Sequence, residues 1–276
     1  MLDQILAVLS NPFFYRAIIA VVLISILAAT VGSIIVFRGL SFLVSAIAHS
    51  ALAGAALAIV LDQYGIIENM NPTVGALLFG IIMAVFIGAY GKTEVREHME
   101  VAIGVSFALS MSLAVLFISM MKEYSVEAWG LILGDILLLS TEDILLLIAI
   151  SVIVAFIFVV FMREFIFVAF DAEGAKALGV NVKLYDMLML ILVASSTVVL
   201  LRGVGAILVY AVLVVPPAIA NVVGKHVADV MVKAFIISVI SGVIGIVVSF
   251  PLHVAPSAII GIILVGLYAV TIAGRR

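Results

Sequence analysis

The chain has 276 residues, of which 67% are hydrophobic and 11% are charged, and its formal net charge is −3. Soluble domains carry about 25% charged residues, so this composition excludes a soluble enzyme, a nucleic-acid-binding protein and a disordered regulator. We therefore expect an all-α, polytopic membrane protein that forms a single transmembrane domain over residues 1–276. The chain has no cysteine and so can form neither a disulfide nor a thiolate metal site.

Membrane spans are predicted from apolar length, because a helix needs about 20 apolar residues to cross a bilayer core of about 30 Å. Nine stretches approach or exceed this length: 14–36, 41–61, 73–90, 101–121, 143–162, 186–201, 204–223, 231–250 and 256–273. The stretch 186–201 is the shortest of the nine. The apolar segment 128–140 is too short to cross, so we expect a re-entrant or interfacial helix there.

Lysine and arginine in short loops predict the orientation, because both are enriched on the cytoplasmic side. With the C-terminus inside, the inner group is Arg38, Lys92, Arg96, Arg163, Lys176, Lys183, Lys225, Lys233, Arg275 and Arg276. The outer group is Arg16, Lys122 and Arg202. We therefore expect the N-terminus outside and the C-terminus in the cytoplasm.

His49 lies near the middle of the second expected span, where an ionisable side chain is costly and marks a functional hypothesis. Imidazole is a common ligand of divalent transition metals, so His49 is the main metal-pathway candidate. Ser45 lies four residues earlier and therefore on the same helix face. The alternative is a neutral His49 that is hydrogen-bonded to a backbone carbonyl. The span is rich in alanine and glycine, which predicts a central helix closely wrapped by its neighbours.

Two further residues are weaker metal candidates. His253 lies in the expected outer turn between the eighth and ninth spans, where it would receive a cation or simply face solvent. Asp135 lies in the segment 128–140, where it would face the pathway or cap interfacial structure.

The seventh expected span contains the pair Pro216-Pro217. Proline lacks a backbone N–H, so the carbonyls of Val212 and Leu213 lose their usual helical partners. This predicts a hinge or a pathway lining, or alternatively a kink that a neighbouring helix satisfies. Asn221 lies one turn beyond Pro217 and is a candidate for either arrangement.

The polar segment between the fifth and sixth expected spans predicts a short cytoplasmic helix over 171–180. Asp171 and Glu173 suit a helix N-terminus, and Gly179 suits a C-terminal cap. Such a helix would dock a cytoplasmic partner through small apolar side chains, namely Ala175, Ala177 and Leu178.

Catalytic chemistry within the chain is not expected. Gly91-Lys92-Thr93 ends like a phosphate-binding loop, but Phe86 stands where the first glycine is needed. No Asp or Glu lies inside one of the clearer expected spans, so an intramembrane hydrolase, which needs several convergent groups, is disfavoured. ATP hydrolysis, if it drives this protein, belongs to another subunit.

Five sequence blocks together resemble the permease subunits of ATP-binding-cassette importers for zinc, manganese and iron. The resemblance covers positions 17 to 270. The blocks are Phe37-Arg38-Gly39-Leu40-Ser41 with Ala46 to Leu52, Ala102-Ile103-Gly104, Trp129 to Asp143, Phe170 to Val180, and Val204 to Ala220. The third and fourth blocks also look like the larger vitamin B12 and siderophore permeases, so a chelate permease is the alternative function. A secondary transporter that works alone is a more distant alternative.

The resemblance implies a homodimer in a prokaryotic cell membrane, with the substrate path along the dimer axis. Two cytoplasmic ATPase subunits would grip the segment Asp171 to Gly179, and an extracytoplasmic metal-binding protein would deliver a divalent metal. No cofactor is implied for this chain; the metal is substrate, and ATP binds the partner. His49 matches the family's pathway histidine, whereas Ser45 stands where many members have an acid and Ala53 where many have a proline. Loss of that carboxylate favours zinc over manganese.

Overall fold

The computed structural model describes residues 12–91, 96–122, 130, 132–252 and 254–274. Within these ranges the chain is a bundle of helices without strands. Eight of the described helices are long and apolar enough to cross a membrane, and Val209–Val223 is a shorter apolar helix. The predicted polytopic helical fold is confirmed.

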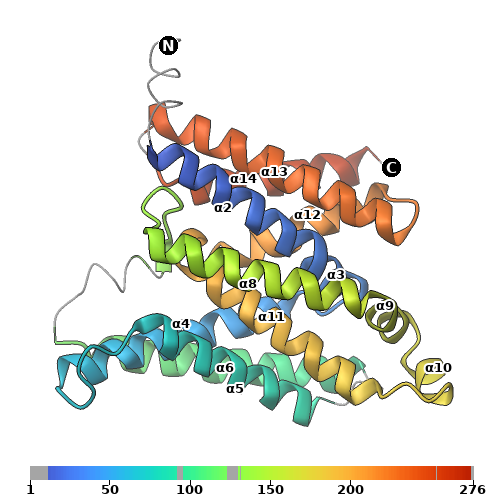
Figure 1. Ribbon diagram of the computed structural model, residues 1–276, viewed down its shortest axis with the longest axis horizontal. Coiled ribbons are helices and arrows are strands. Elements are labelled where there is room, and N and C mark those ends of the chain that lie inside the picture. Colours follow the sequence, from blue (N-terminus) through green and yellow to red (C-terminus); the bar gives the residue numbers. More distant parts are fainter. Residues whose placement is uncertain (1–11, 92–95, 123–129, 131, 253, 275–276) are drawn as a thin grey trace.

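The chain order of the elements explains how the bundle is built. The elements are α2 (Pro12–Leu27), the π-helix η1 (Ala28–Gly32), α3 (Ser33–Phe37), α4 (Phe42–Gln63), α5 (Pro72–Tyr90), α6 (Arg96–Met120), α8 (Thr141–Val160), α9 (Met162–Phe170), α10 (Ala172–Ala177), α11 (Val182–Val204), α12 (Val209–Val223), α13 (Val227–Leu252) and α14 (Pro256–Ala273). Helices α2, η1 and α3 are continuous and form the first long span. Figure 1 shows α2, α8, α11 and α13 running alongside one another, with α10 beyond one end of the bundle.

Helix α4 is the most buried of the spans. In its most apolar stretch 83% of the residues are buried, against 22% for α6. The close packing comes from glycine: a Cβ at Gly54 would lie 2.2 Å from the carbonyl oxygen of Gly75 in α5, and a Cβ at Gly75 would lie 2.3 Å from that of Gly54. Membrane helices associate through such backbone approach, so the structure agrees with the central position predicted for this helix.

The sixth and seventh spans differ from the prediction. Helix α11 covers Val182–Val204 and is not short, whereas α12 begins only at Val209 and has 15 residues. The predicted start of the seventh span at 204 is therefore wrong. The physical reason is Gly205, whose φ of +83° ends α11. A turn over 205–208 then precedes α12.

The segment 128–140 is not the continuous helix that its composition predicted. Of its described residues, Gly130, Ile132 and Leu133 are helical, and 134–140 is irregular, with a turn at 136–137. Gly134 has a φ of +63°, and its backbone meets that of Gly205, because a Cβ there would lie 2.1 Å from the Gly205 nitrogen. The segment therefore packs against protein, as irregular backbone in an apolar bundle must.

The proline pair of α12 packs against the π-helix of the first span. Pro217 leaves the Leu213 carbonyl without an N–H four residues on, and that oxygen lies against Gly32. A Cβ at Gly32 would stand 2.1 Å from the Leu213 oxygen and 3.2 Å from the Pro217 side chain. The neighbouring helix thus covers the freed carbonyl with glycine backbone.

We predict that Gly32→Ala destabilises the folded protein by about 1–3 kcal/mol, because the added methyl overpacks a backbone contact that cannot swing aside. The matched control is Gly266→Ala in α14, where nothing lies within 4 Å of the added Cβ. Thermal unfolding of the purified protein in detergent measures both. Equal melting temperatures for Gly32→Ala and the unaltered protein would contradict the close contact.

Candidate functional site

His49 is held on α4 by its own helix. Its Nδ1 lies 2.8 Å from the backbone oxygen of Ser45. A carbonyl oxygen can only accept, so Nδ1 carries the hydrogen and donates, and Nε2 of the neutral ring keeps its lone pair. The alternative of a backbone-bonded histidine is thus observed, but it leaves the metal-binding nitrogen available. Metal-ligating histidines are commonly oriented by such a bond from the other ring nitrogen.

The imidazole of His49 is covered by an aromatic side chain from α6. The ring centroids of His49 and Phe107 are 5.0 Å apart in an edge-to-face arrangement, and those of Phe107 and Phe42 are 4.9 Å apart. Beyond Phe42 lies a cavity of about 260 Å³ at the end of the bundle that carries α10; its lining is Gly39, Leu40, Phe42, Glu100 and Ile103. One aromatic pair therefore separates the histidine from this cavity.

Within the described part of the chain, no preformed cluster of metal ligands surrounds His49. Among the residues that the structure describes, no group of three or more His, Cys, Asp or Glu side chains is placed to hold a metal ion. Ser45 is half-buried one turn below His49 on the same helix face. Among the described residues, His49 is therefore not part of a preformed cluster of such ligands.

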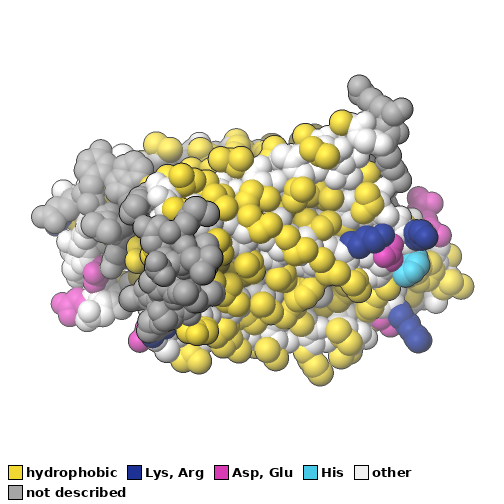
Figure 2. Space-filling view, turned by 90° about the horizontal axis from the view of Figure 1, so that it is seen from above, with side chains coloured by type: hydrophobic (Ala, Val, Ile, Leu, Met, Phe, Trp, Pro, Cys, Tyr) yellow, Lys and Arg dark blue, Asp and Glu magenta, His cyan; other side chains and the backbone are white. Residues whose placement is uncertain are grey.

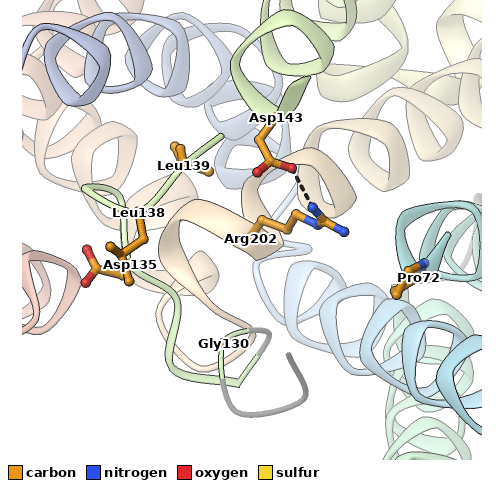
Figure 3. Close-up of a pocket in the computed structure, with 7 residues that line it drawn as sticks. All are labelled: Pro72, Gly130, Asp135, Leu138, Leu139, Asp143 and Arg202. Atoms are coloured by element: carbon orange, nitrogen blue, oxygen red, sulfur yellow. Dashed lines mark hydrogen bonds and ion pairs between the residues drawn. The ribbon is translucent and has the colours of Figure 1, made fainter. Parts of the chain in front are cut away.

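Asp135 lies at a second cavity, of about 220 Å³, at the opposite end of the bundle (Figure 3). Its Oδ1 accepts from the backbone N–H of Leu137 at 2.9 Å, which fixes a turn. Across the cavity Arg202 pairs with Asp143 at 2.7 Å, and the Asp135 carboxylate points away from this ion pair. The two acids do not converge on one point. His253 lies outside the described residues.

Pro216 and Pro217 are both buried inside α12, whereas Asn221 is exposed one turn further on. Asn221 is therefore not the partner of the buried Leu213 carbonyl oxygen, which lies against Gly32. Whether these residues line a pathway stays a prediction.

The segment predicted to dock a partner forms α10, a six-residue helix. Asp171 caps it by accepting from the N–H of Gly174 at 2.8 Å. Gly179, at a φ of +83°, ends it, with the N–H of Val180 donating to the carbonyl of Ala175. The helix is shorter than the predicted 171–180 because both caps lie inside that range.

The exposed face of α10 differs in one residue from the prediction. Glu173, Ala177 and Leu178 are exposed, and Leu178 has 77% of its surface accessible. Ala175 was expected on the same surface but is fully buried, because it packs against Val168 and Val182. Ala175 therefore anchors α10 to the bundle, and Ala177 and Leu178 remain for a partner.

A buried ion pair escaped the sequence analysis. Arg38, at the C-terminal cap of α3, donates from a guanidinium nitrogen to Oδ1 of Asp186 in α11 at 2.5 Å. Their side chains are only 8% and 5% exposed. We expected Asp186 at the first position of the span 186–201, but it lies in the second turn of α11. The two residues are 148 positions apart, so no spacing signal could have paired them.

The charged side chains divide between the two ends of the bundle. By chain order, the α10 end holds the described basic residues Arg38, Arg163, Lys176, Lys183, Lys225 and Lys233, and the other end holds Arg16, Lys122 and Arg202. Figure 2 shows the hydrophobic middle of one face and the basic side chains gathered mostly at one end.

These features define a multi-pass membrane protein with one histidine inside the bundle and a capped surface helix at its end. The ABC 3 transport family matches residues 10–275, and the chain belongs to this family. It is therefore a transport subunit rather than an enzyme.

Relatives and solved structures support this assignment. The chain is 31% identical to the manganese transport system membrane protein MntC of Listeria monocytogenes over 246 residues, 89% of this chain and 85% of the relative. It is 28% identical to the manganese import system permease protein ScaB of Streptococcus parasanguinis over 243 residues, 88% and 84% of the two chains.

Among solved structures, a chain of PsaBC from Streptococcus pneumoniae in complex with Fab matches with a TM-score of 0.83 and 24% identity, covering 98% of this chain and 95% of that one. An inward-facing conformation of a putative metal-chelate type ABC transporter matches with a TM-score of 0.76 and 16% identity, covering 95% and 86%. At these identities the two structures show the shared fold alone.

We predict that Ala175→Asp detaches α10 from the bundle, because burying an unpaired carboxylate costs several kcal/mol. The matched variant Ala177→Asp places the same carboxylate two residues on, in solvent. Hydrogen exchange of residues 165–182 in the purified protein should accelerate only in Ala175→Asp. Unchanged exchange in that variant would show that Ala175 is not the anchor.

Proposed function

We propose that this chain is the permease subunit of an ATP-driven importer that carries a divalent transition metal into the cell, with manganese as the leading candidate. The observation that carries the proposal is His49, which presents a free Nε2 inside the most buried helix of a protein of this family. The chain binds no nucleotide of its own in this scheme, so the energy comes from an ATPase partner.

The choice of metal rests on two opposing arguments. The two relatives described above match most of this chain and are named for manganese, which favours manganese as its substrate. Ser45 in place of an acid removes a hard oxygen ligand, which favours zinc. The sequence-based preference for zinc is not confirmed, and we give more weight to similarity over most of the chain than to one residue.

The partners and orientation follow from the charges and from α10. The basic end of the bundle faces the cytoplasm under the positive-inside rule, which puts the N-terminus outside. The exposed Ala177 and Leu178 then meet a cytoplasmic ATPase subunit. A second copy of this chain supplies a second His49 to the path, and an extracytoplasmic protein delivers the metal.

In this mechanism His49 is a transient ligand. A conduit must hold its ion strongly enough to admit it and weakly enough to release it, and a small number of protein ligands suits that requirement. Phe107 contacts both His49 and Phe42, and Phe42 lines the cavity at the α10 end, so this pair is the gate in the proposed mechanism. ATP-driven movement of α4 against α6 would part these rings and pass the ion inward.

We predict that His49→Ala lowers manganese uptake by at least about tenfold, because loss of an outer-shell partner alone already costs about 10- to 100-fold in metal affinity. Vesicles containing the whole importer and its binding protein provide the measurement. The control His98→Ala removes an exposed imidazole of α6 and should leave uptake unchanged. Wild-type uptake by His49→Ala would remove this histidine from the path.

We predict that Ser45→Asp raises the ratio of manganese to zinc uptake, because a carboxylate one turn from His49 adds a hard ligand that manganese prefers. Competition between the two ions in the same vesicles measures this ratio. The control Asn69→Asp puts a carboxylate in the exposed loop between α4 and α5. An unchanged ratio in Ser45→Asp would show that position 45 does not contribute to ion selection.

A further inference from the structure

Two neighbouring residues at the end of α3 hold both flanks of α10. The ring of Phe37 lies 5.5 Å from that of Phe170, the last residue of α9, which precedes α10 by two positions. The guanidinium of Arg38 binds Asp186 in the second turn of α11, which follows α10. The segment that carries α10 is thus tied to the first span on both sides.

The same two residues lead directly into the helix that bears His49. The N–H of Leu40 donates to the carbonyl of Ile35, and the N–H of Leu43 donates to that of Leu40, so the connection from α3 to α4 is a tight, hydrogen-bonded turn. Gly39 adopts a φ of +66° to allow it, and Leu40 is buried. Because this connection is short and hydrogen-bonded, a movement of Arg38 also moves the start of α4.

Burying the charges of Arg38 and Asp186 costs desolvation free energy, so stability alone does not account for the pair. Both side chains are buried, and Oδ2 of Asp186 has no hydrogen-bond partner. Apolar side chains of similar volume often replace a buried ion pair with equal or greater stability. The ion pair fixes the position of α3 relative to α11, because its geometry is directional. Apolar surfaces alone would let the two helices shift along each other.

We propose that Phe37 and Arg38, with their partners Phe170 and Asp186, form a coupling link that carries the movement of α10 to α4 and His49. The inference rests on the proposed function and adds the route by which a partner's motion at α10 reaches the metal path. Arg38 and Asp186 act as positioning residues, since neither touches the ion in this scheme.

The first test replaces the pair by apolar side chains, Arg38→Met with Asp186→Leu, in the complete importer reconstituted in vesicles. The double variant should assemble and hydrolyse ATP, but the metal moved per ATP should fall by about fivefold or more, the usual scale of a coupling energy. The matched control is Lys233→Met with Asp229→Leu, which removes a more exposed ion pair of α13 at the same end. The control should keep the wild-type ratio.

The second test restores the link covalently, which a chain without native cysteine permits. Phe37→Cys and Phe170→Cys are joined by a short thiol cross-linker, in the wild-type background and in the Arg38→Met, Asp186→Leu background. Because the link moves as one body, cross-linking should leave wild-type uptake intact. It should also raise the transport ratio of the uncoupled variant toward the wild-type value.

Each outcome bears on one of the two proposals. A double variant with the wild-type ratio, or wild-type uptake abolished by the cross-link, would overturn the coupling link while leaving the importer function in place. A cross-link that fails to rescue the uncoupled variant would do the same. Wild-type vesicles that show no ATP-dependent metal uptake would overturn the importer function, and the link would fall with it.

Discussion

The bundle depends on close contact between backbones at glycine. In an apolar environment helices gain little from hydrophobic exclusion, so they associate where small residues let their backbones meet. Gly54 and Gly75 join α4 to α5, Gly134 and Gly205 join the irregular segment 134–140 to the end of α11, and Gly32 covers a carbonyl of α12. Each contact would be blocked by a single methyl group.

These contacts also determine where irregular backbone is allowed. The break between α11 and α12 packs against the irregular segment 134–140, and Pro217 of α12 packs against the π-helix of the first span. Backbone groups that a regular helix would satisfy are thus enclosed by protein rather than left exposed to lipid. The same arrangement leaves α4 enclosed, with His49 in its interior.

The proposed transport function favours a weak metal site at His49. His49 has a free Nε2 but no described cluster of ligands around it, and Phe107 covers its ring. A fixed, closed metal site would trap an ion, whereas a path needs ligands that assemble and separate. In the proposed mechanism, this path is controlled from the α10 end, by the capped helix, its exposed Leu178 and the nearby Arg38–Asp186 pair.

Features that depend on apolar length or on neighbouring residues could be predicted from the sequence. Apolar length gave most of the spans, small residues predicted the central α4, and Asp171 and Gly179 marked the caps of α10. Contacts between residues far apart in the chain became known only from the folded arrangement. In the structure Ala175 is buried, α12 begins at Val209, and Arg38 pairs with Asp186, which lies 148 positions further along the chain. Helix periodicity repeats within a few residues and carries no record of these distant contacts, which depend on how the helices pack.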